Sequence, residues 1–184
     1  MSSPEAPERL DAFHWAFDKL YPAIRFTYER LLGHAWFSQV VPRLWLGGAP
    51  TYRRDHDALL ADGITAVLDI RAERPPDRAF YEAHGISYRR LPVPDMDVPT
   101  EDDLTRAVDW INAQLAADRT VLVHCAKGRG RSATVLAAYL MREDGMSFDE
   151  ARELLHSKRA LAKLEARHRR VLESWIASQA VARG

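Results

Sequence analysis

The residues best suited to chemistry surround the single cysteine of the chain, Cys125. Arg131 follows it by six positions and Ser132 by seven, and two glycines, Gly128 and Gly130, lie between them. Glycines allow a tight loop whose backbone N–H groups turn inward and bind an anion. A thiol at the base of such a loop ionises easily, because the amides and a nearby arginine stabilise the negative sulfur. The pattern therefore predicts a phosphate-binding loop that also activates a nucleophile.

The loop residues have predicted roles in the attack of a thiolate on a phosphate monoester. Cys125 is the predicted nucleophile. Arg131 is predicted to bind two phosphate oxygens with its planar guanidinium, and Ser132 to donate a hydrogen bond to the departing sulfur. His124 is predicted to hydrogen-bond the loop backbone rather than to act as a base. The remaining substrate-binding positions are Ala126, Lys127, Gly128, Arg129 and Gly130, of which Lys127 and Arg129 either attract a multiply charged substrate or are merely solvated.

A general acid is also expected, on a separate loop, because an alkoxide leaving group needs a proton. The proline-rich segment 91–99 carries two candidates, Asp95 and Asp97. Asp95 is favoured because Pro94 stiffens the chain directly before it, and Asp97 is the second choice. The alternative is that Asp95 is an ordinary aspartate of a turn, with no part in catalysis.

Alternating strands and helices are predicted to position these residues. Apolar, β-branched runs predict buried strands at 64–70 and 120–124, and the cysteine loop connects the second strand to a helix. Such a loop lies at the carboxyl end of a strand, where α/β sheets bind ligands against a helix N-terminus. Arg71, Glu73 and Arg74 are expected to be salt-bridged loop residues at the same sheet edge. Further strands are predicted at 44–47 and 86–91, and helices at 51–61, 77–84, from 101 onward, 131–143, 148–159 and 165–180.

The repeated alternation predicts an α/β fold with a central, mostly parallel sheet of four to five strands flanked by helices. This domain is expected to span residues 41–180. Residues 1–8 are predicted to be a disordered start, and residues 9–40 a helical extension rich in aromatic side chains. The extension either contacts a membrane surface through residues 9–37 or packs on the domain.

The composition excludes several classes of protein. Of 184 residues, 47% are hydrophobic and 28% are charged, as in an ordinary soluble domain. The 26 basic and 26 acidic residues cancel, so charge-driven binding to nucleic acid is not expected. A single cysteine excludes an intramolecular disulfide and a cysteine-rich zinc site, and no metal or cofactor is predicted. No apolar run approaches the roughly 20 residues of a membrane span, which predicts a cytoplasmic location with membrane association as an option.

The segment from His124 to Ser132, with an aspartate-bearing loop about thirty residues upstream, resembles the dual-specificity branch of the protein tyrosine phosphatases. The resemblance runs from about Val41 to Trp175, and the cysteine loop is its specific part. It implies a cysteine-dependent phosphatase fold with the nucleophile at Cys125, the phosphate-binding arginine at Arg131 and the general acid at Asp95.

One subgroup is more similar than the rest, the mitochondrial-type phosphatidylglycerophosphate phosphatases and their bacterial relatives. The similarity lies in Tyr21-Pro22, in Trp36-Phe37 and in the segment 94–104. Two positions depart from that subgroup. The segment 71–74 replaces an acidic stretch, and alanine follows the cysteine directly, with Lys127 one place later.

The resemblance implies a phosphate-monoester hydrolase that forms a phosphocysteine and acts on phosphatidylglycerophosphate or a phosphoinositide-like lipid. A phosphotyrosine-protein phosphatase is the alternative within the class. A non-catalytic pseudophosphatase that only binds phosphate is the alternative outside it. That reading is disfavoured because Cys125, Arg131, Ser132 and Asp95 are all present.

Overall fold

The computed structural model describes residues 22–23, 25–74 and 77–183, and the chain divides into two compact units, Met1–Trp36 and Phe37–Gly184. The predicted disordered start at 1–8 and the first part of the predicted helical extension lie outside the described residues. The larger unit contains the cysteine loop and every strand of the described chain.

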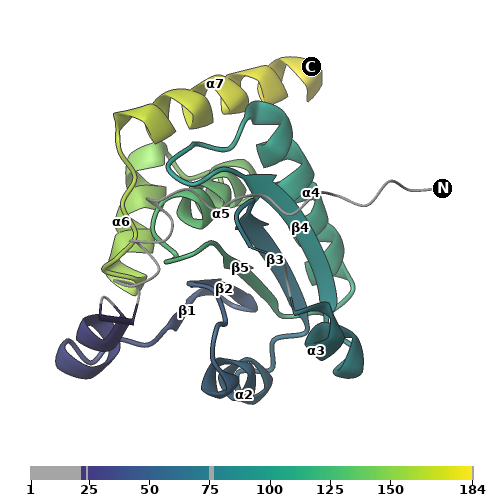
Figure 1. The fold of residues 1–184 in the computed structure, drawn as a ribbon. Coiled ribbons are helices and arrows are strands. Elements are labelled where there is room, and N and C mark those ends of the chain that lie inside the picture. Colours follow the sequence, from purple (N-terminus) through teal and green to yellow (C-terminus); the bar gives the residue numbers. More distant parts are fainter. Residues whose placement is uncertain (1–21, 24, 75–76, 184) are drawn as a thin grey trace. The chain divides into compact units, whose positions relative to one another are not determined.

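Five strands form one sheet in the order β1-β2-β5-β3-β4 (Figure 1). Four of them are parallel: β2 (Leu44–Gly47), β5 (Val121–His124), β3 (Ala66–Arg71) and β4 (Ser87–Val93). The two central strands, β5 and β3, are buried over their full length, because their apolar side chains are covered on both faces. The predicted α/β fold with a mostly parallel sheet is thereby confirmed.

The fifth strand, β1 (Phe37–Val41), shows that the predicted helical extension does not continue to residue 40. It pairs antiparallel with β2 at the sheet edge, and Phe37 lies opposite Gly47. A Cβ on Gly47 would lie 2.5 Å from the Phe37 ring, so the ring uses the space that glycine leaves. Pairing with the next strand along the chain, β2, decides the structure of these five residues, and a segment so short carries no clear period of its own.

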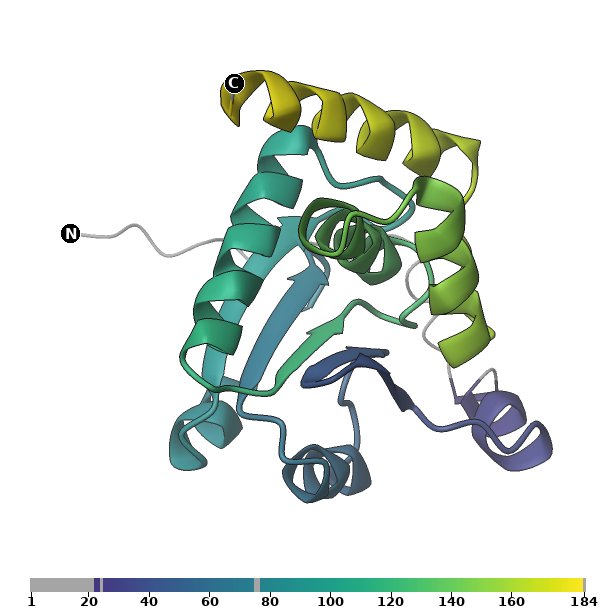
Figure 2. The same ribbon diagram turned by 180° about the vertical axis from the view of Figure 1, so that it is seen from behind.

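Helices cover the sheet on both sides (Figures 1 and 2). α2 (Arg53–Ala61) and α3 (Arg78–Ala83) lie below it in both views. On the other side are α4 (Glu101–Ala116), α5 (Arg131–Glu143), α6 (Phe148–Lys158) and α7 (Ala166–Arg183). α5 starts directly after the cysteine loop and is buried along most of its length, since it packs against β5, α4, α6 and α7. The end of β5 and the start of α5 therefore form a rigid base for the loop.

The described part of the smaller unit contains a helical turn of the π type, Thr27–Leu31. Arg25 donates hydrogen bonds to both carboxylate oxygens of Glu29, at 2.9 and 3.0 Å, and its guanidinium lies 4.3 Å from the centre of the Trp36 ring. Among the described residues of this unit, three large apolar side chains are exposed: Phe26, Leu31 and Leu32. Within the described residues, no helix combines the length and the hydropathy needed to cross a membrane.

Candidate active site

The cysteine loop is held in place through its carbonyl oxygens. All five carbonyls from residue 126 to residue 130 accept hydrogen bonds from surrounding segments, at 2.8 to 3.1 Å. The donors are the backbone N–H groups of Ala49, Lys163 and Thr134 and the guanidinium of Arg159. Because the carbonyls point outward, the loop can turn its N–H groups inward, which is the arrangement that binds an anion. The predicted phosphate-binding positions therefore share one cradle.

Arg159, which the sequence analysis did not identify, clamps this loop from the end of α6. Its guanidinium is buried and donates to Gly128 O at 3.1 Å and to Lys127 O at 2.9 Å. Gly128 has a φ of +65°, and a Cβ there would lie 2.5 Å from Gly47 O. Gly128 is thus required both by its backbone conformation and by its close contacts. No local pattern marks Arg159, because its partners are backbone groups about 30 residues earlier in the chain.

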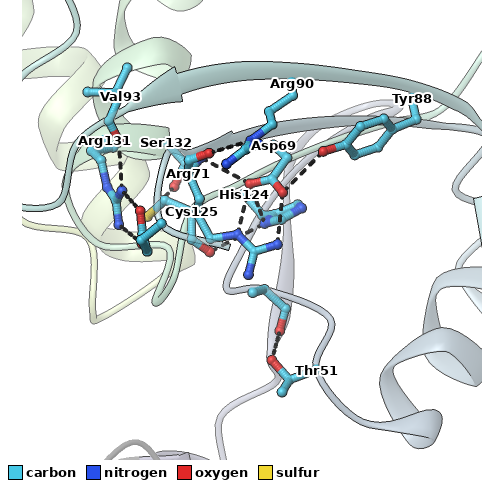
Figure 3. A network of polar contacts seen from close by, with 12 residues as sticks. Thr51, Asp69, Arg71, Tyr88, Arg90, Val93, His124, Cys125, Arg131 and Ser132 are labelled. Carbon is cyan, nitrogen blue, oxygen red and sulfur yellow. Dashed lines mark hydrogen bonds and ion pairs between the residues drawn. The ribbon is translucent and has the colours of Figure 1, made fainter. Parts of the chain in front are cut away.

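The Cys125 sulfur lies at the base of the cradle. Burial opposes ionisation of this thiol, but the positive charge of Arg131 and hydrogen bonds from Ser132 and the backbone of Arg129 outweigh it, so the pKa of Cys125 is lowered. The Ser132 hydroxyl donates to the sulfur at 3.3 Å (Figure 3). A thiolate is the nucleophilic form of cysteine, so these contacts prepare Cys125 for attack.

The Arg131 guanidinium is fully engaged at its two terminal nitrogens. Nη1 donates to Glu73 Oε2 at 2.7 Å and to Val93 O at 2.9 Å. Nη2 donates to Glu73 Oε1 at 2.7 Å and lies 2.8 Å from Asp95 Oδ1. Burial disfavours the charged forms of Arg131 and Glu73. Their ion pair outweighs this effect, so the pKa of Arg131 is raised and the pKa of Glu73 is lowered. Arg131 is therefore a fixed cation whose orientation is set by Glu73.

The two candidate acids lie in different surroundings. Asp95 directly follows Pro94 at the end of β4 and pairs with Arg131, with its side chain 20% exposed. Asp97, two residues later, is exposed, and its backbone N–H bonds to Pro94 O at 3.3 Å. The structure thus brings Asp95, and not Asp97, to Arg131, the predicted phosphate-binding arginine.

A buried network of polar side chains holds the chain just before Glu73. The sequence predicted salt bridges here but not this network. Asp69, at the end of β3, accepts hydrogen bonds from the Arg71 side chain at 2.9 and 2.8 Å (Figure 3). Arg90 from β4 donates to Arg71 O at 2.9 Å and also to Ala72 O. These contacts fix the backbone just before Glu73. The expected salt bridges are present for Arg71 and Glu73, and the one made by Glu73 positions the guanidinium of Arg131.

His124 is fully buried beside this network and makes the predicted contact with the loop backbone, with Nδ1 3.3 Å from Cys125 O. Burial lowers its pKa to about 4, although Asp69, at 3.8 Å, works in the opposite direction. Within the described chain, His124 Nε2 has no hydrogen-bond partner, so a proton on it would be buried and unpaired. His124 is therefore neutral at physiological pH.

This burial predicts a pH-dependent stability. The pKa of His124 is about 4 in the folded chain and near 6.5 when unfolded, so the unfolded state binds more protons between these values. Stability should consequently fall as the pH is lowered, by about 2 kcal/mol between pH 7 and pH 5 from this residue. Urea denaturation of the wild-type protein and of His124→Gln at both pH values measures the difference. The exposed His84→Gln serves as control, and an equally steep loss in His124→Gln would contradict the assignment.

Comparison with known proteins agrees with this geometry. Residues 44–177 match the catalytic domain of the dual specificity phosphatases. A phosphatidylglycerophosphate phosphatase of Arabidopsis thaliana, PTPMT2, is 30% identical over 159 residues, which are 85% of this chain and 68% of that protein. The chain belongs to the dual specificity phosphatase family of the protein tyrosine phosphatase superfamily, and it is a cysteine-dependent phosphatase.

Other relatives include the human dual specificity protein phosphatase 12, 38% identical over 130 residues, which are 68% of this chain but only 37% of that protein. Among solved structures, PTPMT1 has a TM-score of 0.71 at 27% identity, over 80% of this chain and 99% of that one. Tk-PTP in its active form has a TM-score of 0.69 at 28% identity, over 76% and 95% of the two chains. The predicted family and fold are confirmed.

Proposed function

We propose that this phosphatase hydrolyses a phosphate monoester on a phospholipid head group through a phosphocysteine at Cys125. The placement of the sulfur carries the proposal: it lies at the base of an anion cradle, receives the Ser132 hydroxyl and is stabilised by the charge of Arg131. A thiolate in such a cradle is placed to attack the phosphorus of a bound monoester.

In the first step, the Cys125 thiolate forms a bond to phosphorus while the bond from phosphorus to the leaving oxygen breaks. The loop N–H groups and Arg131 stabilise the charge on the three equatorial oxygens. Asp95 in its protonated form gives its proton to the leaving oxygen, which departs as an alcohol.

In the second step, a water molecule attacks the phosphorus of the phosphocysteine. The Asp95 carboxylate takes a proton from this water, and the bond between sulfur and phosphorus breaks. The sulfur leaves as a thiolate, stabilised by the Ser132 hydroxyl, and inorganic phosphate is released. The enzyme returns to its starting state with no redox change.

Substrate binding should break the ion pair between Asp95 and Arg131. Arg131 Nη2 already donates to Glu73 and pairs with Asp95, so a phosphate that binds this nitrogen must displace one of them. Asp95 is the more exposed of the two carboxylates and has the single contact. Phosphate binding therefore releases Asp95 from Arg131 and frees it to protonate the leaving group.

Asp95→Asn should slow the hydrolysis of an alkyl phosphate by about 10²- to 10⁴-fold, because asparagine cannot protonate the leaving oxygen. With p-nitrophenyl phosphate, whose leaving group needs little protonation, the loss should be much smaller. Steady-state rates on both substrates measure the contrast. Asp97→Asn is the matched control, and an equal loss in that variant would reassign the acid.

The lipid substrate is supported by a relative that matches 85% of this chain and is named as a phosphatidylglycerophosphate phosphatase. A crystal structure of PTPMT1 contains PI(5)P, although at 24% identity it supports only the shared fold. The exposed Phe26, Leu31 and Leu32 would suit a peripheral contact with a membrane surface. Sedimentation with anionic phospholipid vesicles tests that contact directly.

A phosphotyrosine-protein phosphatase is the second candidate, since the human relative at 38% identity is named as a protein phosphatase. Phosphate release from phosphatidylglycerophosphate micelles and from a phosphotyrosyl peptide, measured side by side, separates the two. We expect kcat/KM on the lipid to exceed that on the peptide by at least an order of magnitude. The reverse preference would assign the chain to protein dephosphorylation.

A further inference from the structure

A second depression lies beside the phosphate cradle. It has a volume of about 700 Å³ and is formed by α6, by the connection from α6 to α7 and by Arg129 of the cysteine loop. In both ribbon views α6 lies close to the end of β5, where the cysteine loop begins (Figures 1 and 2). The cavity and the catalytic loop therefore share Arg129 as a common wall.

The connection that forms the cavity is bonded to the loop itself. Lys163 N donates to Arg129 O at 3.0 Å, and Arg159, at the start of the same connection, donates to two other loop carbonyls. His156 binds Ala162 O at 3.2 Å and so ties the connection back to α6. These bonds hold the cavity in a fixed position relative to Cys125, as a substrate subsite requires.

The rim of the cavity has a positive balance. Three cationic side chains, those of Arg129, Arg152 and Lys163, stand against the two carboxylates Asp149 and Glu153. Arg152 pairs with Asp149 at 3.0 Å, and Lys163 pairs with Glu165, outside the cavity, at 3.2 Å. Arg169 also reaches Asp149 from outside the cavity. The described residues offer the Arg129 guanidinium no hydrogen bond or ion pair, and this exposed cation lies between the cradle and the cavity.

Below this rim the lining is apolar. The connection contributes Leu161, Ala162 and Leu164, of which the last two are buried. A site with a cationic rim and an apolar floor suits a ligand that carries an anionic group attached to an apolar body. A lone phosphate would use only the rim.

We propose that this cavity binds the second anionic group of the substrate, a phosphodiester that joins the reacting phosphate to an apolar body. The proposal rests on the proposed reaction at Cys125, because the reacting phosphate must occupy the adjacent cradle. Arg129, Arg152 and Lys163 contact the phosphodiester, and the apolar floor receives the first atoms beyond it. The site thereby selects a phospholipid head group over a simple phosphate monoester.

The test compares Arg152→Ala, Lys163→Ala and their double variant with the wild-type protein. The substrates are water-soluble dihexanoyl phosphatidylglycerophosphate, a phosphotyrosyl peptide with neighbouring glutamates, and p-nitrophenyl phosphate. We expect each single change to raise KM for the lipid about 5- to 10-fold with kcat unchanged. Rates on p-nitrophenyl phosphate should stay at the wild-type level. Arg170→Ala on α7, an exposed arginine outside the cavity, is the matched control.

A binding measurement without turnover tests the cavity independently of the proposed hydrolysis at Cys125. Titration calorimetry of the dihexanoyl lipid into Cys125→Ser protein, with and without the two cavity substitutions, should show the same loss of affinity. Inactivity of the wild-type protein on all three substrates would refute the proposed function but not this difference in binding.

Three results would overturn the cavity assignment. The first is an unchanged KM and an unchanged affinity for the lipid in the double variant. The second is an equal loss on the lipid and on p-nitrophenyl phosphate, which would indicate a structural role. The third is a loss confined to the acidic peptide, which would assign the cavity to a protein substrate.

Discussion

Replacing Cys125 with serine is expected to reduce turnover by at least about 10⁴-fold, because the nucleophile is removed while the rest of the site remains. The surroundings that lower the pKa of the thiol cannot ionise a serine hydroxyl to a useful extent at neutral pH. The cradle itself does not depend on the sulfur, since its carbonyls are held by framework groups such as Arg159. Cys125→Ser should therefore still bind substrate.

Rapid acid quench during turnover provides the direct measurement. Mass spectrometry should find phosphate on Cys125 of the wild-type protein and no phosphate on the serine variant. Turnover at the wild-type rate in Cys125→Ser would refute the mechanism. Cys125→Ala is the companion variant, and it should be as inactive as the serine protein if the loss reflects the missing thiolate.

Arg131→Lys should lower kcat by about 10³-fold or more, although the charge is kept. The guanidinium contacts Glu73, Val93 O and Asp95 at once, and it must exchange Asp95 for phosphate while the other two contacts hold it. A lysine ammonium is a compact charge on a flexible stem and cannot reproduce this planar arrangement. Displacement of the charge from the sulfur should also raise the pKa of Cys125, since Arg131 is the main group that lowers it.

Two measurements separate these effects. Steady-state kinetics on p-nitrophenyl phosphate reports the loss in kcat, and the rate of iodoacetate alkylation against pH reports the thiolate. The alkylation profile of Arg131→Lys should move to higher pH. Arg106→Lys on the surface of α4 is the control. Unchanged kinetics and an unchanged alkylation profile in Arg131→Lys would show that Arg131 neither binds the phosphate nor lowers the pKa of Cys125.

The sequence alone was sufficient to predict which side chains meet around the cysteine. Cys125, Arg131 and Ser132 lie within eight consecutive positions, between a buried apolar strand and a helix, so their proximity follows from local chain geometry. The parallel strands were predictable for a similar reason, since β3 and β5 are mostly apolar runs, as expected of strands covered on both faces. The central sheet and the nucleophile loop are thus encoded locally.

The tertiary structure decided how that loop is supported and extended. Arg159 clamps backbone carbonyls about 30 residues away, and Glu73 orients Arg131 from a position 58 residues earlier. Neither contact leaves a periodic or spaced signal, because a backbone carbonyl exists at every residue and an ion pair needs only proximity after folding. The choice between Asp95 and Asp97 at Arg131 and the cavity beside Arg129 share this origin. Each depends on segments that meet only when the sheet and its helices have packed.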